Sequence, residues 1–586
     1  MTSAPAAPIE CDVLVAGSGA GGLAAAVAAA FHGLSVVVAE KEPVFGGTTA
    51  WSGGWLWIPR NPLARRAGIE EDPEEPLAYL KCELGNRVAD PRIPAYLANG
   101  PDMVAFFEQN TAVQWIDGNR IPDFHDTPGS RQGGRSVCAR PFDGRALGQD
   151  IARLKPPLDL VSLAGMGIAA GADMNHFFNA TRSARSALHV AGRLARHARD
   201  RALHGRAMQL VNGNALVARL MKSALDLGVT LMENAPITAL RHDGDRVCGA
   251  TLGSGVEIVA RRGVVLATGG FPHDRGRIAR LFDHAPDGTG HFSAAPRSNT
   301  GDGIRLGETA GARITGDEAA AGAWCPVSLV PRSDGGFAHF PHLVDRAKPG
   351  FIAVTPDGRR FVNEAGSYHD FMTALFAATP GAAKPECWLI CDHRAQRRFG
   401  IGWAKPFPFP LRPYQACGYL KSGRTLEALA APCGLPAGAL AETVARFNAH
   451  AKAGDDPDFG RGRSPYNRVQ GDSAHGPNPS LGALEEGPFH AVRLVPGSLG
   501  TFAGMATDAE ARVLDVTGAP IPGLYAAGND MASIFGGHYP SGGITLGPAM
   551  TFGYIAARHM AGLAGAGAQT TDNRERSDEI LRTGNP

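Results

Sequence analysis

The sequence predicts an α/β protein whose N-terminal domain is Rossmann-like, and three observations support this prediction. Residues 12–16, DVLVA, are a short apolar run that ends at glycine, as a buried parallel strand does. The Ala-rich residues 22–33, GLAAAVAAAFHG, have the pattern of a helix that Gly33 closes. Residues 34–40, LSVVVAE, are a second apolar run, which completes a strand, helix, strand unit that ends at Glu40.

The length and charge of the chain limit the kinds of protein it can be. At 586 residues it exceeds the size that one hydrophobic core usually serves, so two or more domains are expected. With 57 basic and 56 acidic side chains the formal net charge is +1, which provides no overall field for a nucleic acid partner. The nine cysteines include no CxxC pair, which indicates reduced thiols of a cytoplasmic protein and no metal site. No basic region precedes an apolar stretch at the N-terminus and no run of about 18 apolar residues occurs, so export and membrane spanning are disfavoured.

The loop between the first strand and the helix carries a GxGxxG motif, Gly17 to Gly22, with Glu40 eighteen residues later. Absent side chains would let a pyrophosphate approach the helix N-terminus, whose free amides and dipole favour anions. Glu40 would accept hydrogen bonds from ribose hydroxyls, and its charge disfavours a 2′-phosphate. The motif therefore predicts a dinucleotide cofactor rather than a merely tight turn.

Three further segments, GGTTAWSGG (46–54), VVLATGG (264–270) and PGLYAAGN (522–529), resemble the flavoprotein subunits of fumarate reductases and succinate dehydrogenases. In that family such segments wrap FAD, so the resemblance implies FAD. It extends over most of the chain except roughly 150–210. Relatives that attach FAD covalently carry a histidine in the segment matching TTAWSGG, which has none here, so we expect noncovalent FAD. The cofactor-binding residues that the motif and the resemblance indicate are Gly17, Ser18, Gly19, Gly22, Glu40, Lys41, Gly47, Thr48, Thr49, Ser52, Gly53, Ala235, Pro236, Ala267, Thr268, Gly269, Gly270, Gly528, Asn529, Gly543, Ile544 and Leu546.

The resemblance implies a Rossmann-like FAD-binding domain of the fumarate reductase flavoprotein type, with an inserted α+β substrate or cap domain. We expect the first part of the FAD-binding domain over 1–285, with a basic helical insertion at about 156–210. The expected substrate domain is 286–488, the return segment of the FAD-binding domain is 489–566, and a flexible tail follows at 567–586. The active site would lie between the two domains, at flavin N5.

Two stretches face the substrate in the family, and both depart from the fumarate reductases. GRRFVNEAGSYHD (358–370) resembles those enzymes as far as RFVNE, then places Tyr368 where they have the arginine that protonates the alkene. Gly543 takes the place of an arginine that binds a substrate carboxylate. Burying a dicarboxylate without bidentate partners is costly, so a neutral or weakly polar ketone is expected. Arg360 and Glu364 fit a structural ion pair as well as the active site, and NTGDG (299–303) suits a structural turn.

The loop YPSGG (539–543) resembles the matching loop of 3-ketosteroid Δ1-dehydrogenases, in which a tyrosine hydroxyl and a glycine amide bind the ketone oxygen. The resemblance assigns Tyr539 and Gly543 to this oxyanion hole. It assigns to Tyr368 the removal of the α-proton, while a hydride leaves the β-carbon for flavin N5. The steroid enzymes supply a further tyrosine where this chain has Phe124, followed by His125. The candidate substrate-pocket residues are Phe124, His125, Phe535 and His538.

The implied function is FAD-dependent desaturation of a ring ketone, most simply the 1,2-desaturation of a 3-ketosteroid, with an unknown external electron acceptor. A small cyclohexanone-type substrate, a fumarate or enoate reductase, and a flavin-binding protein without turnover remain alternatives. Residues 182–206 carry seven arginines opposed only by Asp200 and are expected to be helical. This segment fits a solvated helical face or a peripheral contact with an anionic membrane, so we expect a cytoplasmic protein with or without membrane association.

Overall fold

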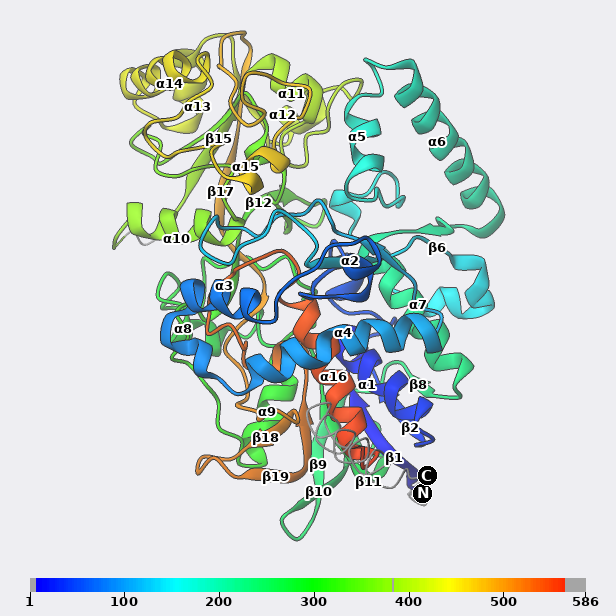
Figure 1. Ribbon diagram of the computed structural model, residues 1–586. Coiled ribbons are helices and arrows are strands. Elements are labelled where there is room, and N and C mark those ends of the chain that lie inside the picture. The colour runs from blue at the N-terminus through cyan, green and yellow to red at the C-terminus, as the bar shows by residue number, and fades with distance from the viewer. Residues whose placement is uncertain (1–6, 382–383, 564–586) are drawn as a thin grey trace, which may run out of the picture.

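The computed structural model describes residues 7–381 and 384–563, which form two sheet-based units and a peripheral helical insertion (Figure 1). The predicted fold class is confirmed, since a parallel sheet with flanking helices is joined to a second, antiparallel sheet. The predicted tail, 567–586, lies outside the described residues. All nine cysteines are free thiols.

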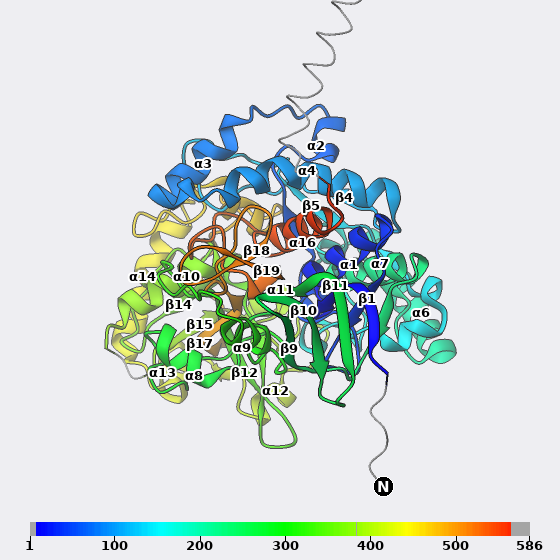
Figure 2. The same ribbon diagram turned by 90° about the horizontal axis from the view of Figure 1, so that it is seen from below.

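The first unit is an eight-stranded sheet centred on β1, which pairs in parallel with β2 and β11. Its main path runs β18, β19, β11, β1, β2, β8, and the antiparallel hairpin of β9 and β10 extends it beside β11. Helix α1 packs against α7 and α16, and Figure 2 shows α16 between α1 and α4. The bounds are β1 Ile9–Ala16, α1 Ala20–Phe31, β2 Val36–Ala39, α4 Arg92–Asn110, α7 Asn212–Asp226, β8 Thr230–Met232, β9 Ile237–Asp243, β10 Arg246–Leu252, β11 Glu257–Leu266, β18 Arg512–Leu514, β19 Pro520–Ala526 and α16 Leu546–Met560.

The second unit is a six-stranded antiparallel sheet in the order β13, β12, β17, β15, β14, with β16 also paired to β17. Helices surround it in the upper left of Figure 1. The bounds of its elements are β12 Gly322–Pro331, β13 Phe337–Pro341, β14 Phe351–Val354, α10 Tyr368–Ala378, β15 Cys387–Cys391, α11 His393–Phe399, α12 Arg412–Ala416, β16 Lys421–Gly423, α13 Leu426–Cys433, α14 Ala437–Ala451, α15 Pro465–Gln470 and β17 Phe489–Thr501.

Both expected edges of the substrate domain shift in the structure. Strand β17 was expected in the return segment, but it is the central strand of the second sheet. Residues 286–321 were expected in the substrate domain, but Asn299 bonds to Gly269 and α9 (Asp302–Thr309) packs against β9 of the first sheet. Apolar strand patterning predicts a strand without saying which sheet it joins, so these edges could not be read from the sequence.

Smaller elements connect the two units. A three-stranded sheet, β3, β5, β4, lies beside α16, and the short pair β6 and β7 leads into the insertion. The bounds are β3 Trp55–Trp57, α2 Pro62–Arg66, α3 Glu74–Leu84, β4 Trp115–Asp117, β5 Ser136–Ala139, β6 Phe142–Asp143, β7 Gln209–Leu210 and α8 Arg275–Leu281.

The basic insertion contains α5 (Ala172–Phe178) and the predicted long helix, α6 (Ala184–His204), which lies at the edge of the molecule (Figure 1). The buried face of α6 is polar and consists of Ser186, His197 and Asp200. Large apolar side chains lie on the outside, with Leu188 76% and Leu203 68% exposed. This distribution is the reverse of that in an ordinary surface helix. Within the described ranges, no helix is both long and apolar enough to cross a membrane.

Candidate active site

Four segments far apart in the sequence meet at the carboxyl ends of β1 and β11. A Cβ on Gly17 would lie 2.3 Å from the Ala267 carbonyl oxygen, and one on Gly22 would lie 2.1 Å from the Gly17 carbonyl oxygen. A Cβ on Gly21 would lie 3.2 Å from the Gly528 amide nitrogen, and one on Gly270 would lie 3.0 Å from Asn529 Cβ. Only glycine permits the backbone approaches at Gly17 and Gly22, and a side chain at Gly21 or Gly270 would be crowded, so the predicted motifs build one common cradle.

The N-terminus of α1 opens into this cradle. Gly19 is its N-cap residue and supplies no side-chain cap, while the Ala20 amide donates to Thr49 Oγ1 at 3.0 Å. The nearest atom to a Cβ on Gly47 would be Gly19 Cα, at 4.0 Å, so the second glycine-rich segment lies directly over the first. Free amides and the helix dipole suit a pyrophosphate at this point.

Glu40 follows β2 at the same edge and is 8% exposed. Its Oε2 accepts from the Ser18 amide at 3.1 Å and from the Ser18 hydroxyl at 2.6 Å, and its Oε1 accepts from the Glu42 amide at 3.0 Å. Lone pairs remain on both oxygens for ribose hydroxyls. The Ala235 amide donates to the Glu40 carbonyl at 2.8 Å, which brings Ala235 and Pro236 beside the same site.

Lys41 forms an ion pair with Asp302, at the start of α9. Asn299, expected in a structural turn, donates to Thr48 Oγ1 at 3.0 Å and to the Gly269 carbonyl at 3.1 Å. The turn is therefore structural and also ties two predicted cofactor segments together. The Ser52 hydroxyl donates to the Thr49 carbonyl at 2.8 Å. This bond stabilises residues 48–52, the segment in which relatives with covalently bound FAD carry the attaching histidine.

Asp530 is a functional residue that sequence reasoning missed. Its buried carboxylate accepts from the Thr268 amide at 2.6 Å and the Gly270 amide at 2.9 Å. Burial raises the pKa of Asp530 above its usual value, and the bonds from Thr268 and Gly270 oppose that shift. The sequence feature that could have identified Asp530 is its position directly after the segment PGLYAAGN, which ends at Asn529. Together with the glycine cradle and Glu40, this geometry fits FAD.

The two tyrosines assigned to catalysis are brought together although 171 residues separate them. Tyr368 is the first residue of α10 and donates its hydroxyl hydrogen to the Tyr539 oxygen at 2.7 Å, with the rings 5.0 Å apart. The hydroxyl hydrogen of Tyr539 is thereby left to donate elsewhere. Burial raises the pKa of Tyr368 well above its usual value and that of Tyr539 to about 12.

Gly543 lies between this pair and α16, with φ at +102°. A Cβ at this position would lie 2.7 Å from the Trp57 amide nitrogen. The Gly543 carbonyl accepts from the Trp57 amide at 3.2 Å and from the Gly547 amide at 2.9 Å, which fixes the orientation of the loop. Ile544 follows directly, and Leu546 is the first residue of α16. The loop is held on its other side by the Tyr79 hydroxyl, which donates to the Pro540 carbonyl at 2.5 Å.

Phe124 completes the aromatic surroundings of the two tyrosines. Its ring is stacked on Tyr539 at 5.7 Å, lies edge-on to Tyr368 at 5.7 Å, and lies 4.5 Å from Tyr466, which sequence reasoning did not single out. Tyr466 carried no motif signal. Phe535 packs instead against Trp57 at 6.0 Å in the core.

His125 does not replace the assisting tyrosine that Phe124 lacks. Its Nε2 pairs with Asp370 Oδ2 at 2.7 Å and its Nδ1 pairs with Glu83. Burial disfavours the charged ring, but the hydrogen bonds and charges of Asp370 and Glu83 prevail and raise the pKa of His125 to about 10. His125 therefore links α3 to the first turn of α10, next to Tyr368. His538 is half-buried beside this cluster, and burial lowers its pKa.

The RFVNE segment forms a buried ion network away from the tyrosines. Arg360 binds Glu364 at 2.7 Å and Asp456 at 2.9 Å, and Arg461 binds Glu364 at 3.0 Å. All four side chains are almost fully buried. Of the two interpretations of Arg360 and Glu364, the structure supports the structural ion pair.

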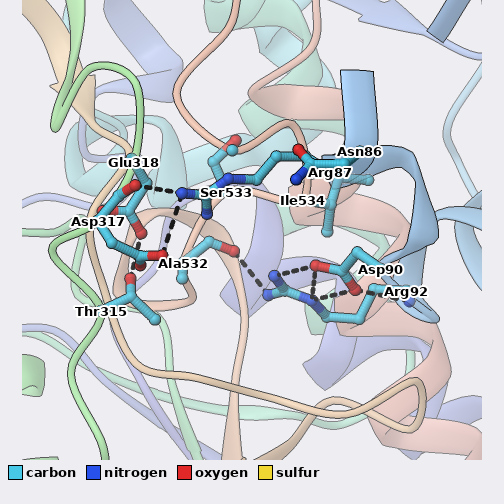
Figure 3. Close-up of a pocket in the computed structure, with 11 residues that line it drawn as sticks. Asn86, Arg87, Asp90, Arg92, Thr315, Asp317, Glu318, Ala532, Ser533 and Ile534 are labelled. Atoms are coloured by element: carbon cyan, nitrogen blue, oxygen red, sulfur yellow. Dashed lines mark hydrogen bonds and ion pairs between the residues drawn. The ribbon is translucent and has the colours of Figure 1, made fainter. Parts of the chain in front are cut away.

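A cavity of about 280 Å³ is lined in part by residues 532–536, which precede Tyr539 in the sequence (Figure 3). Its charged walls are paired internally, with Arg92 on Asp90 at 2.6 Å and Arg87 on Asp317 at 3.0 Å. Arg92 also donates to the Ala532 carbonyl at 2.8 Å. These cations are committed to the fold, so the cavity does not supply the carboxylate-binding arginines that the sequence lacks.

Known proteins resemble the chain over almost its whole length. A family model described as an FAD binding domain matches residues 12–546. A 4-oxocyclohex-2-ene-1-carboxylate 5-dehydrogenase from Sinomonas cyclohexanicum is 42% identical over 562 residues, which are 95% of this chain and 95% of that protein. A 3-oxosteroid 1-dehydrogenase from Mycolicibacterium smegmatis is 37% identical over 577 residues, 95% of this chain and 98% of that protein.

The solved structure of 3-ketosteroid delta1-dehydrogenase from Sterolibacterium denitrificans, in complex with 1,4-androstadiene-3,17-dione, superposes with a TM-score of 0.86. It is 35% identical and covers 94% of this chain and 99% of its own. The chain belongs to the FAD-binding flavoprotein family that includes the 3-oxosteroid 1-dehydrogenases, and it is an FAD-dependent dehydrogenase acting on CH–CH bonds.

Proposed function

We propose that the protein desaturates a monocyclic six-membered ring ketone next to its carbonyl group. The observation that supports this choice is Phe124, which stands where the resemblance to the steroid enzymes calls for a tyrosine and contacts both catalytic tyrosines. The relative with 42% identity is named for a cyclohexenone carboxylate, as is a 37% identical 4-oxocyclohexanecarboxylate 2-dehydrogenase from Sinomonas cyclohexanicum.

The ketone oxygen would bind between the Tyr539 hydroxyl and the Gly543 amide. Because Tyr368 donates to Tyr539, the Tyr539 hydrogen is available for the ketone. Two donors on this oxygen stabilise the negative charge that develops when the adjacent C–H bond breaks. The buried position excludes water, which strengthens both hydrogen bonds.

Tyr368 takes the α-proton, and FAD, when bound, accepts the hydride that leaves the β-carbon. The substrate thus loses one proton and one hydride and gains a C=C bond. Tyr368 must be ionised to act, and the hydrogen that it gives to Tyr539 in the resting site is the one it must lose first, so the ketone has to hold the Tyr539 hydrogen at that stage. The place of Tyr368 at the N-terminus of α10 favours its negative charge. Burial acts against ionisation, so the proton acceptor is strong once formed.

A 3-ketosteroid is the second candidate substrate. It is favoured by the TM-score of 0.86 to the steroid enzyme and by the resemblance of the loop 539–543 to the ketone-binding loop of the 3-ketosteroid Δ1-dehydrogenases. The physiological electron acceptor is a separate question, and we propose no candidate for it.

Anaerobic bleaching of the flavin absorbance tests the proposal. The oxidised protein is mixed with 4-oxocyclohexanecarboxylate, 4-methylcyclohexanone or a 3-ketosteroid. We expect the monocyclic ketones to bleach the flavin faster than the steroid. In a separate arm fumarate is added to protein whose flavin has first been reduced chemically, and we expect the flavin to stay reduced. Bleaching by the steroid alone would establish the second candidate, and bleaching by none would contradict both.

A further inference from the structure

Tyr466 is the third phenol of the site, and nothing in the mechanism above uses it. It lies on α15, is 3% exposed, and its ring is tilted by 44° against Phe124 at 4.5 Å. The neighbouring Asn467 anchors α15 by donating to the Ala365 carbonyl at 2.9 Å. The ring of Tyr466 is thus held in place beside Phe124, which contacts both catalytic tyrosines.

The Tyr466 hydroxyl differs from the other buried phenols. The hydroxyl of Tyr79 donates to Pro540, that of Tyr96 to Trp57, and that of Tyr419 bonds to Ser328. Among the residues that the structure describes, the Tyr466 hydroxyl has no hydrogen-bond partner. The Tyr466 oxygen is not among the fully enclosed unpaired atoms, so it keeps some accessible surface through which a ligand could supply the missing partner.

Arg346 is a buried guanidinium whose charge acts on Tyr466. Its nitrogens donate to the carbonyls of His342 at 2.8 Å and Glu364 at 2.9 Å, and no carboxylate of the described part of the chain forms an ion pair with it. Burial raises the pKa of Tyr466, the charge of Arg346 opposes that shift, and the charges of Asp370 and Tyr539 add to it. Arg346 has the largest effect of these three groups, so a negatively charged group bound at Tyr466 would be stabilised by Arg346 and partly opposed by Asp370.

The other cations near the tyrosines are less suitable. His125 already pairs with two carboxylates, Glu83 and Asp370, so a third anion there would be repelled. Arg360 and Arg461 are committed to Glu364 and Asp456. The combination of a free phenol donor and the field of Arg346 occurs at Tyr466.

We propose that Tyr466 contacts the substrate and donates a hydrogen bond to a carboxylate on the ring, away from the ketone, while Arg346 supplies the compensating field. This inference rests on the proposed function, because it requires a ring ketone bound at Tyr539 and Gly543. It names the substrate class as oxo-cycloalkane carboxylates. It also explains how a carboxylate is accepted although the two arginine positions of the fumarate reductases hold Tyr368 and Gly543.

The test compares two ketones in Tyr466→Phe. The FAD-containing variant and the wild type are mixed anaerobically with 4-oxocyclohexanecarboxylate and with 4-methylcyclohexanone, and the rate constant of flavin bleaching divided by the apparent Kd is measured for each. The substitution deletes one oxygen atom and no hydrogen bond within the protein. We expect the preference for the carboxylate over the methyl compound to fall about 10-fold or more, as for a lost hydrogen bond to a charged group.

Tyr414→Phe is the matched control, because Tyr414 lies on α12 against Trp403, at 4.9 Å, and outside the site. It should retain the wild-type preference. The Tm of Tyr466→Phe should not fall below that of the wild type, which would separate lost binding from lost folding. An unchanged preference in Tyr466→Phe, with a wild type that bleaches with both ketones, overturns the inference alone. A wild type that bleaches with neither ketone overturns the proposed function and the inference with it.

Discussion

Replacing each catalytic tyrosine by phenylalanine separates proton transfer from carbonyl binding. Tyr368→Phe deletes the proton acceptor but leaves the Tyr539 hydroxyl and the Gly543 amide for the ketone. Flavin reduction should therefore slow by about 10²-fold or more while the apparent Kd of the ketone changes little. The loss of the 2.7 Å bond between the hydroxyls should cost about 0.5–1.5 kcal/mol in the free energy of unfolding.

Tyr539→Phe removes one of the two donors to the ketone oxygen and leaves the buried Tyr368 hydroxyl without its acceptor. Reduction should slow by about 10² to 10³-fold, and the apparent Kd of the ketone should rise as well. Because the two phenols share one hydrogen bond, the double variant should lose less than the product of the two single effects.

Stopped-flow bleaching over a range of ketone concentrations measures both quantities. Tyr419→Phe is the matched control, since the Tyr419 hydroxyl forms a buried 2.7 Å bond with Ser328 in the second unit. The control should lose stability without losing rate. Near-normal flavin reduction in Tyr368→Phe would refute the assignment of Tyr368 as the proton acceptor.

Three further outcomes are expected. The flavin should stay in solution when the protein is precipitated with acid, because residues 48–52 contain no histidine for covalent attachment, and a coloured pellet would contradict this. The rate of flavin reduction should rise about tenfold per pH unit from neutral to alkaline pH. The reason is that burial holds the pKa of Tyr539 at about 12 and that of Tyr368 higher, so the ionised fraction of Tyr368 grows over this range. A rate independent of pH in this range would contradict the prediction. We propose that α6 docks on anionic lipid through its arginines and the exposed Leu188 and Leu203. The protein should therefore cosediment with anionic vesicles. Added salt should weaken the cosedimentation, because charges are screened within about 10 Å at 0.1 M salt. Equal cosedimentation with neutral vesicles would exclude the electrostatic contribution.

The cofactor cradle could be predicted because its signals are local. A GxGxxG motif between a strand and a helix requires close backbone contact, and the structure shows it at Gly17 and Gly22. The meeting of Tyr368 and Tyr539 was predictable only through resemblance, since no spacing rule links residues 171 positions apart.

Residues whose roles depend on distant partners could not be predicted. His125 was a candidate for the substrate pocket, but its partners, Glu83 and Asp370, lie 42 and 245 residues away. Tyr466 has no motif at all, and its role follows from a missing hydrogen bond, which only coordinates reveal. Burial and pairing are properties of the folded chain, so a sequence pattern does not report them.

The departures from the fumarate reductases at positions 368 and 543 are linked through the backbone. Gly543 has φ at +102° and a Cβ there would lie 2.7 Å from the Trp57 amide nitrogen, so the loop that carries Tyr539 requires glycine. An arginine at position 543 would have to displace β3 from the start of α16 before it could bind a carboxylate. An arginine at position 368 would replace the proton acceptor by a permanently charged donor. Placing arginine at both positions would therefore disrupt the ketone site without forming a dicarboxylate site. The reason is that an arginine at position 543 needs a different backbone path where this loop contacts β3 and enters α16.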